Sequence, residues 1–142
     1  MTQNSSRIVF AFDFGLKHMG LAVGQEVTQT ANTLYSLKAK NGKPDWNDLD
    51  KIVGDWEPKL FVLGNPLNMD GSKSKIKEHS DRFSNLIRER YKVPVELVDE
   101  RLTTKEATSR MKLKEIISNK KDLNRHSLSA KIILESWFRE KK

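Results

Sequence analysis

The stretch IVFAFDFGLKHMGLAVG, residues 8–24, decides the organisation of the chain. Its first seven residues are apolar or aromatic apart from Asp13, which is typical of a strand covered on both faces. Glycines mark a turn after it, and residues 20–23 predict a second strand that runs back along the first. A charge inside such a run needs an explanation, because burying a carboxylate is costly without a cation, hydrogen bonds or a proton to neutralise it.

The regions that follow predict an α/β chain. Residues 30–39 predict a third strand that ends at the turn signal Asn41-Gly42, so the chain opens with an antiparallel meander. From residue 45 the apolar spacing changes to three and four, which predicts an amphipathic helix over 45–56 that is capped by Asp45. Strands over 60–64 and 93–98 and helices over about 73–91, 104–117 and 125–140 complete a pattern with βαβ crossovers.

Composition excludes several kinds of chemistry. The chain has no cysteine, which excludes disulfides, thiol nucleophiles and cysteine-based metal sites. Lys and Arg number 26 against 19 Asp and Glu, a formal charge of +7, and the excess is spread over several predicted helices. This balance favours an acidic polymer as partner, nucleic acid first.

Length and hydropathy indicate one domain and no membrane partner. The 142 residues suit a single domain, 1–142, in which residues 1–6 form a flexible N-terminus. No run approaches the roughly 20 apolar residues of a membrane span, and no apolar signal-peptide core follows the polar residues 1–7. We expect a cytoplasmic protein.

Asp13 is the first candidate for a functional site. It alternates with Val9 and Ala11 on one strand face, so its side chain is expected to point into a largely apolar layer. It either accompanies a bound cation or is a structural residue that accepts hydrogen bonds from the turn at Gly15.

A second acidic cluster lies at the end of a later strand. Asp99 and Glu100 stand where residues 93–98 give way to a helix, and functional sites of open α/β sheets collect at strand ends. The alternative is an exposed ion pair with the neighbouring Arg101, which contributes little energy.

Four motifs occur in the order and at the spacing of a known family: AFDFGLKHMGLAVG, VLGNPLNMDGS, VDERLTTKEA and LSAKIILESWF. From about residue 8 to 138 the chain resembles the YqgF family, RuvC-like proteins that are related to Holliday-junction resolvases and described as pre-16S rRNA nucleases. The resemblance implies an α/β, ribonuclease-H-like fold, with a five-stranded mixed sheet whose first three strands are antiparallel and which is flanked by helices.

The resemblance also implies a metal site. In this superfamily, carboxylates from the first strand, a later strand end and the final helix converge on one or two divalent ions. Matching positions makes Asp13 and Glu100 metal ligands and catalytic residues, with Asp99 nearby in reserve. Mg²⁺ or Mn²⁺ is the expected cofactor, because a pair of such ions can activate a water and stabilise the leaving oxygen of a phosphodiester.

The third ligand position departs from the family pattern. Where the family reads DSxSA, this chain reads HSLSA, so His126 stands in place of an aspartate. A neutral imidazole brings no negative charge and suits Mn²⁺ or Zn²⁺ better than Mg²⁺. His126 is then a third metal ligand and catalytic residue, a surface histidine in a protein with weakened or lost catalysis, or the neighbour of a compensating carboxylate such as Asp122, one helical turn earlier.

Basic and polar residues are expected to bind the substrate backbone without reading its sequence. The predicted nucleic-acid contacts are Lys17, Asn68, Lys73, Lys75, Arg101, Lys121 and Arg125, with Lys77 and Lys120 as further basic residues of the same track. The large aromatic residues are expected in the core instead: Tyr35, Trp46, Trp56 and Trp137.

Taken with the resemblance, these features predict a metal-dependent nuclease that hydrolyses phosphodiester bonds in structured RNA. The expected substrate is the 5′ end of precursor 16S rRNA, on its own or in the ribosomal small subunit, and the protein is expected to be a monomer or a homodimer. Two alternatives stay open. One is a Holliday-junction resolvase-like nuclease acting on branched DNA, which requires a symmetric dimer. The other is a catalytically impaired RNA- or ribosome-binding module, because His126 replaces the third acidic residue.

Overall fold

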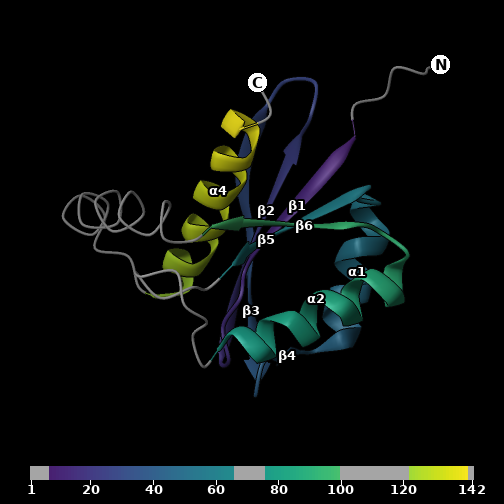
Figure 1. The fold of residues 1–142 in the computed structure, drawn as a ribbon, viewed down its shortest axis with the longest axis vertical. Helices are drawn as coiled ribbons and strands as arrows, with labels where there is room; N and C mark the ends of the chain where they lie inside the picture. Colours follow the sequence, from purple (N-terminus) through teal and green to yellow (C-terminus); the bar gives the residue numbers. More distant parts are fainter. Residues whose placement is uncertain (1–6, 66–75, 100–121, 141–142) are drawn as a thin grey trace.

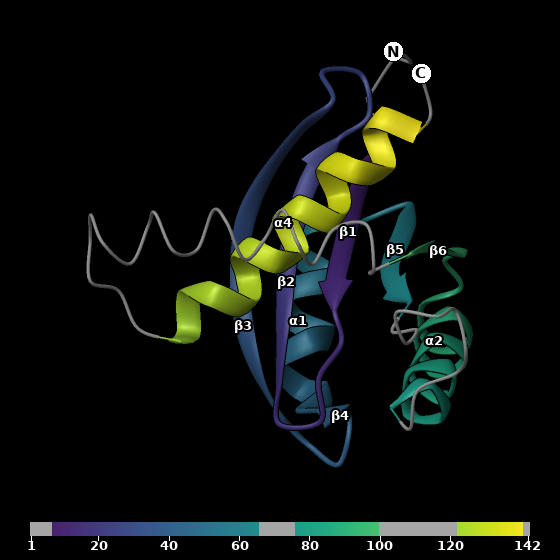
Figure 2. The ribbon, with the colours of Figure 1, turned by 60° about the vertical axis from the view of Figure 1, so that its left-hand side comes forward.

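The computed structural model describes residues 7–65, 76–99 and 122–140. In these residues six strands form one mixed sheet in the order β4-β3-β2-β1-β5-β6. The elements along the chain are β1 (Ile8–Asp13), β2 (His18–Gln25), β3 (Thr30–Lys40), β4 (Lys43–Pro44), α1 (Trp46–Trp56), β5 (Leu60–Asn65), α2 (Lys77–Tyr91), β6 (Val95–Asp99) and α4 (Asp122–Glu140). Helix α4 covers one face of the sheet, and α1 and α2 lie on the other (Figures 1 and 2).

The first three strands form the expected antiparallel meander. The expectation of five strands is wrong for the described residues, because β4 adds a sixth. Asn41 and Gly42 both adopt positive φ, 53° and 81°, as a tight two-residue hairpin turn requires. The turn leads the chain back along β3, where Lys40 pairs with Lys43.

The other half of the sheet is parallel. Strand β5 lies beside β1, with Phe12 paired to Leu63, and β6 lies beside β5, with Asn65 paired to Asp99. The carboxyl ends of these parallel strands therefore meet at one edge of the sheet, which we call the carboxyl edge: the ends of β1, β5 and β6 at Asp13, Asn65 and Asp99.

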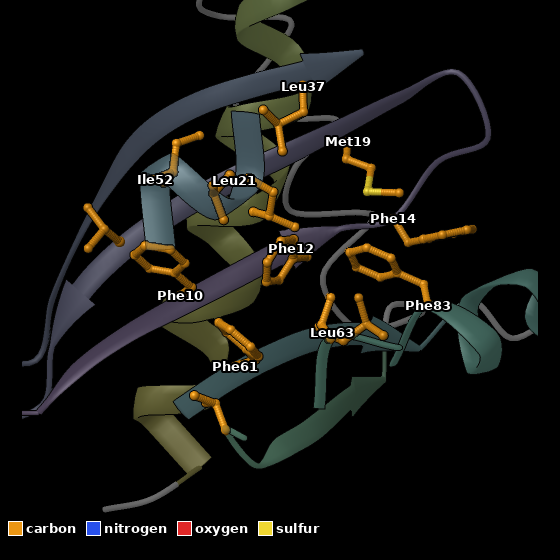
Figure 3. Close-up of a cluster of buried hydrophobic side chains, with 14 residues drawn as sticks. Phe10, Phe12, Phe14, Met19, Leu21, Leu37, Ile52, Phe61, Leu63 and Phe83 are labelled. Atoms are coloured by element: carbon orange, nitrogen blue, oxygen red, sulfur yellow. The ribbon is translucent and has the colours of Figure 1, made fainter. Parts of the chain in front are cut away.

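Strand β1 is buried on both faces, as its apolar run predicts. Phe10, Phe12 and Phe14 pack under α1 and α2, whereas Val9 and Ala11 pack under α4. Figure 3 shows the aromatic side, where Phe12 meets Phe61 edge-to-face with ring centroids 5.5 Å apart. Alternation along the strand therefore assigns Asp13 to the α4 face.

The described helices form in the regions where the apolar spacing predicts them, but α2 begins at Lys77 and not at about residue 73. The carboxylate of Asp45 caps α1 by accepting a hydrogen bond from the main-chain N of Asn47 at 2.9 Å. On α2, Phe83 and Ile87 are buried, but Leu86 is 44% exposed. Helix α4 starts at Asp122, three residues before the expected start at 125.

Small residues at alternate positions of β2 explain how α4 sits on the sheet. Gly20, Ala22 and Gly24 share the face that carries α4. A Cβ added to Gly24 would lie 2.9 Å from Leu134 Cδ2 and 3.2 Å from Phe138 Cε2. Because Gly20, Ala22 and Gly24 have little or no side chain, α4 can approach β2 closely.

The expected burial of the large aromatic residues is confirmed for some and wrong for others. Trp137 is 3% exposed, and Trp46 is partly buried and stacks on Phe83. Tyr35 and Trp56 are 51% and 39% exposed. Trp56 is the last residue of α1, where the helix leaves the core. Tyr35 lies on the long β3 strand, which among the described residues has only the two-residue β4 on its outer side.

Two expectations lie outside the described residues: the helix over 104–117 and the flexible N-terminus over 1–6. Within the described residues, none of the helices has the length and apolar character needed to span a membrane.

Candidate active site

Asp13 ends β1 at the carboxyl edge and is half-buried. It faces Gly20 across the antiparallel pair of β1 and β2. Residues paired in this way direct their side chains to the same face, with Cβ atoms about 5 Å apart. The side chain of Asp13 therefore lies beside the space that a side chain at position 20 would occupy.

The main chain of His126 fills that point. A Cβ added to Gly20 would overlap the His126 carbonyl oxygen and approach the main-chain nitrogen of Ser127 to 2.8 Å. This contact places the His126 backbone beside the residue that pairs with Asp13. Two of the three predicted metal ligands, which lie far apart in the sequence, are thus neighbours across Gly20.

His18 joins Asp13 and His126 in this region, and we call the three residues the site cluster. The sequence alone did not point to His18. Its ring stacks on that of His126, with centroids 5.2 Å apart and planes 17° from parallel. As the first residue of β2, His18 shares a strand face with Gly20. The alternation alone could have placed His18 beside Asp13, but its contact with α4 depends on how that helix packs.

The second predicted ligand adjoins the same edge along the chain. Strand β6 ends at Asp99, which pairs with Asn65 of β5. Glu100 is the next residue and lies outside the described residues. In the part of the chain that the structure describes, no three His, Asp or Glu side chains form a group that could hold a metal ion.

The early start of α4 bears on the compensating carboxylate. The helix continues back to Asp122, four residues before His126 and therefore about one turn away on the same side of the helix. Asp122 can neighbour His126 only if the helix extends back to it, and the main chain of α4 does so.

Three of the expected basic contacts fall within the described residues. Lys17 is exposed in the turn between β1 and β2, and Arg125 directly precedes His126 on α4. Lys77 instead forms an ion pair with Asp81 at 2.6 Å, with only 12% of its side chain exposed. The remaining predicted contacts lie outside the described residues: Asn68, Lys73, Lys75, Arg101, Lys120 and Lys121.

A strong electrostatic contact lies away from the candidate site, between α1 and α2. Arg90 donates two hydrogen bonds to the Asp50 carboxylate at 2.8 and 2.6 Å, and the Tyr91 hydroxyl donates a third at 2.7 Å. Hydrogen bonds from Arg90 and then Tyr91 lower the pKa of Asp50 to about 2. We expect this interaction between α1 and α2 to contribute to the stability of the fold and not to catalysis.

The sheet order and the placement of α4 define a RuvC-like α/β fold of the ribonuclease-H class. Similar solved structures are the Thermus thermophilus RuvC in complex with a Holliday junction substrate (TM-score 0.56, 16% identity, 95% of both chains) and the yeast mitochondrial Holliday junction resolvase Ydc2 (TM-score 0.51, 13% identity, 95% of this chain and 78% of that one). The chain belongs to the RuvX family, whose model, described as Holliday junction resolvase, matches residues 7–140.

Curated relatives agree with this assignment. A protein of Buchnera aphidicola subsp. Schizaphis graminum is 44% identical over 133 residues, covering 94% of this chain and 97% of its own. One of Nitrosococcus oceani is 44% identical over 134 residues, covering 94% and 88%. Both bear the name "Putative pre-16S rRNA nuclease". The resemblance to the YqgF family is confirmed.

Proposed function

We propose that this protein is a metal-dependent nuclease that hydrolyses phosphodiester bonds in structured RNA and processes the 5′ end of precursor 16S rRNA. Membership of the RuvX family and the names of relatives above 40% identity support a nuclease. The observation that carries the proposal is that Gly20 pairs with Asp13 and also packs against the main chain of His126 at the carboxyl edge. Such a role would place the protein in the cytoplasm, as a monomer or a homodimer.

The chemistry of the donor set fits a divalent ion. Asp13 supplies a carboxylate beside an apolar layer, where a cation would offset its burial, and His126 supplies an imidazole. Glu100 would complete the set, with Asp122 one turn from His126. Mg²⁺ or Mn²⁺ would activate the attacking water and stabilise the leaving oxygen, and the imidazole favours Mn²⁺.

His126 has the surroundings of a working residue. It is half-buried, stacked on His18 and held by its main chain against β2. A surface histidine in a protein that has lost its activity would need none of these contacts. We therefore assign His126 as the third ligand and His18 as the residue that positions its ring.

The remaining residues of the candidate site would serve the substrate. Lys17 and Arg125 flank the cluster along the chain and would neutralise phosphates on either side of the scissile bond. The loop and strand-end contacts expected from the sequence, from Asn68 to Lys121, remain predictions.

A second candidate substrate is branched DNA. It is favoured by the likeness to the Thermus thermophilus RuvC, which was solved in complex with a Holliday junction substrate. Cleaving a two-fold symmetric junction would require a dimer, so the oligomeric state separates the two substrates.

The test is cleavage of a precursor 16S rRNA and of a four-way DNA junction, each with Mg²⁺ and with Mn²⁺. Wild type is compared with Asp13→Asn and Glu100→Gln, and with Asp55→Asn as a control that removes an exposed carboxylate of α1. We expect rRNA cleavage that is lost in the first two variants and kept in the control. Cleavage that survives both substitutions would refute the mechanism, and binding without any cleavage would favour the RNA-binding module.

A further inference from the structure

A groove of about 450 Å³ lies between the β3–β4 turn and helix α2. One wall is the turn Asn41–Lys43, and the other is formed by α2 residues from His79 to Glu89. We call it the α2 groove. In Figure 1, α2 crosses the end of the molecule that carries β4.

The spacing of residues on α2 explains the character of this groove. His79, Arg82 and Leu86 follow one another at three- and four-residue intervals, so they share one face of the helix. Phe83 lines the groove from the core side and is only 1% exposed, so Leu86 supplies the apolar surface that a ligand would meet. Leu86 is 44% exposed, which leaves a large apolar side chain in a groove whose rim is polar.

The charges of the groove are available to a ligand. Lys43 on the turn and Arg82 on the helix approach it from opposite walls, and neither forms a salt bridge or side-chain hydrogen bond with any described residue. The Asn85 side-chain oxygen accepts a hydrogen bond from Arg88 at 2.8 Å, and its amide N–H groups donate to none of the described residues. Among the described residues of the lining, Glu89 is the single acidic one, so the formal charge of these residues is net positive.

We propose that the α2 groove binds one nucleotide of a single-stranded RNA segment. Lys43 and Arg82 would hold its phosphate, and the base would lie on Leu86 beside the ring of His79. Paired cations around an apolar floor match a nucleotide, which has an anionic end and a flat apolar base. The volume is at the lower end of the range for small-ligand sites, about 300–1,000 Å³.

The α2 groove lies near the candidate active site. That the RNA bound in the groove is the substrate cleaved at that site rests on the proposed function. A Cβ added to Gly42 would lie 2.8 Å from the ring of Phe14 and 3.5 Å from the Cβ of His79. The Phe14 ring is also 5.5 Å from that of Phe83. Phe14 directly follows Asp13, so the α2 groove and the candidate active site lie near the same end of β1, on opposite faces of the sheet. An RNA strand that passes around the carboxyl edge could therefore contact both sites.

The test measures binding without chemistry. A fluorescently labelled 12-nucleotide oligouridine is titrated with protein in EDTA, and anisotropy is followed from 50 to 200 mM salt. The groove variant is Lys43→Gln with Arg82→Gln. The matched control, Lys51→Gln with Lys59→Gln, removes two exposed lysines outside the groove. Circular dichroism confirms that each variant is folded.

We expect the groove variant to bind at least tenfold more weakly and to lower the salt dependence, log K against log salt, by about 0.7, because the two cations hold one phosphate and each neutralised phosphate on a single strand contributes about 0.7. The control should change affinity less than twofold. Leu86→Ser should weaken binding at least threefold with the salt dependence unchanged, because it removes the surface under the base and no charge.

Wild-type affinity in the groove variant, or equal losses in the groove variant and the control, would overturn the proposal. An oligoglutamate peptide that binds more tightly than the RNA and loses affinity in the same variant would overturn RNA as the occupant. The proposed nuclease function fails separately, through cleavage that survives Asp13→Asn, because binding in EDTA does not require the metal site.

Discussion

Gly20→Ala is expected to damage the candidate site through a single methyl group. The added Cβ would overlap the main-chain carbonyl of His126, and a main-chain atom cannot rotate aside as a side chain can. Restoring an ordinary contact requires β2 and the start of α4 to separate by roughly 1–2 Å. Because Asp13 pairs with Gly20, the separation carries His126 away from Asp13.

The cost divides into stability and activity. Overpacking of this kind costs about 1–3 kcal/mol of unfolding free energy, and a displacement on the order of 1 Å between catalytic groups costs about 100-fold in rate. Unfolding is measured in urea and cleavage under single-turnover conditions, at a temperature where each variant is folded. We expect both losses in Gly20→Ala.

Two other glycines provide controls. Gly24→Ala would overlap the Thr30 carbonyl oxygen and press on Leu134 of α4, so it should cost similar stability but leave the cleavage rate of the folded protein within a few-fold of wild type. A Cβ on Gly54 of α1 would meet no atom within 4 Å, so Gly54→Ala should stabilise the protein by about 0.5–1 kcal/mol. Wild-type cleavage by Gly20→Ala, or an equal loss in Gly24→Ala, would refute the reasoning.

Three further predictions concern side chains. His126→Asp should raise Mg²⁺-dependent cleavage by supplying a hard, negative oxygen ligand; an unchanged or lower rate with an intact circular dichroism spectrum would oppose the ligand role. His18→Ala should lower kcat about 2- to 13-fold at constant KM, since an aromatic pair contributes about 0.5–1.5 kcal/mol, and His18→Phe should restore most of the loss; a structural role alone would not produce this recovery. The lowered pKa of Asp50, about 2 against 3.8, stabilises the folded state above pH 4, and this contribution is lost as the pH falls toward 2. Urea midpoints of wild type and Asp50→Asn should therefore differ at pH 7 and converge near pH 2, and a constant difference would contradict the assignment.

Local patterns in the sequence were sufficient for most of the fold. The alternation in residues 8–14 reports burial on both faces of β1, and the capping position of Asp45 reports the start of α1. Both features involve residues that are close together in the sequence, so a local sequence pattern is enough to predict them. The short β4 strand was missed because two residues are too few for a period to be visible.

The candidate site was predictable only in part, for a physical reason. Asp13 is conspicuous as a charge in an apolar strand, and the family pattern supplied His126. The placement of the His126 main chain beside the partner of Asp13 depends on Gly20, Ala22 and Gly24 letting α4 lie close to β2, which is a property of the packed structure. The stacking of His18 on His126 depends on the same packing.

The most direct measurement is the affinity of the protein for Mn²⁺, determined by isothermal titration calorimetry on wild type, Asp13→Asn, His126→Ala and the control Asp55→Asn. If Asp13 and His126 share an ion, each of the first two substitutions will weaken Mn²⁺ binding at least tenfold, and the control will bind like wild type. Wild-type affinity in both Asp13→Asn and His126→Ala would show that the two residues do not form a metal site.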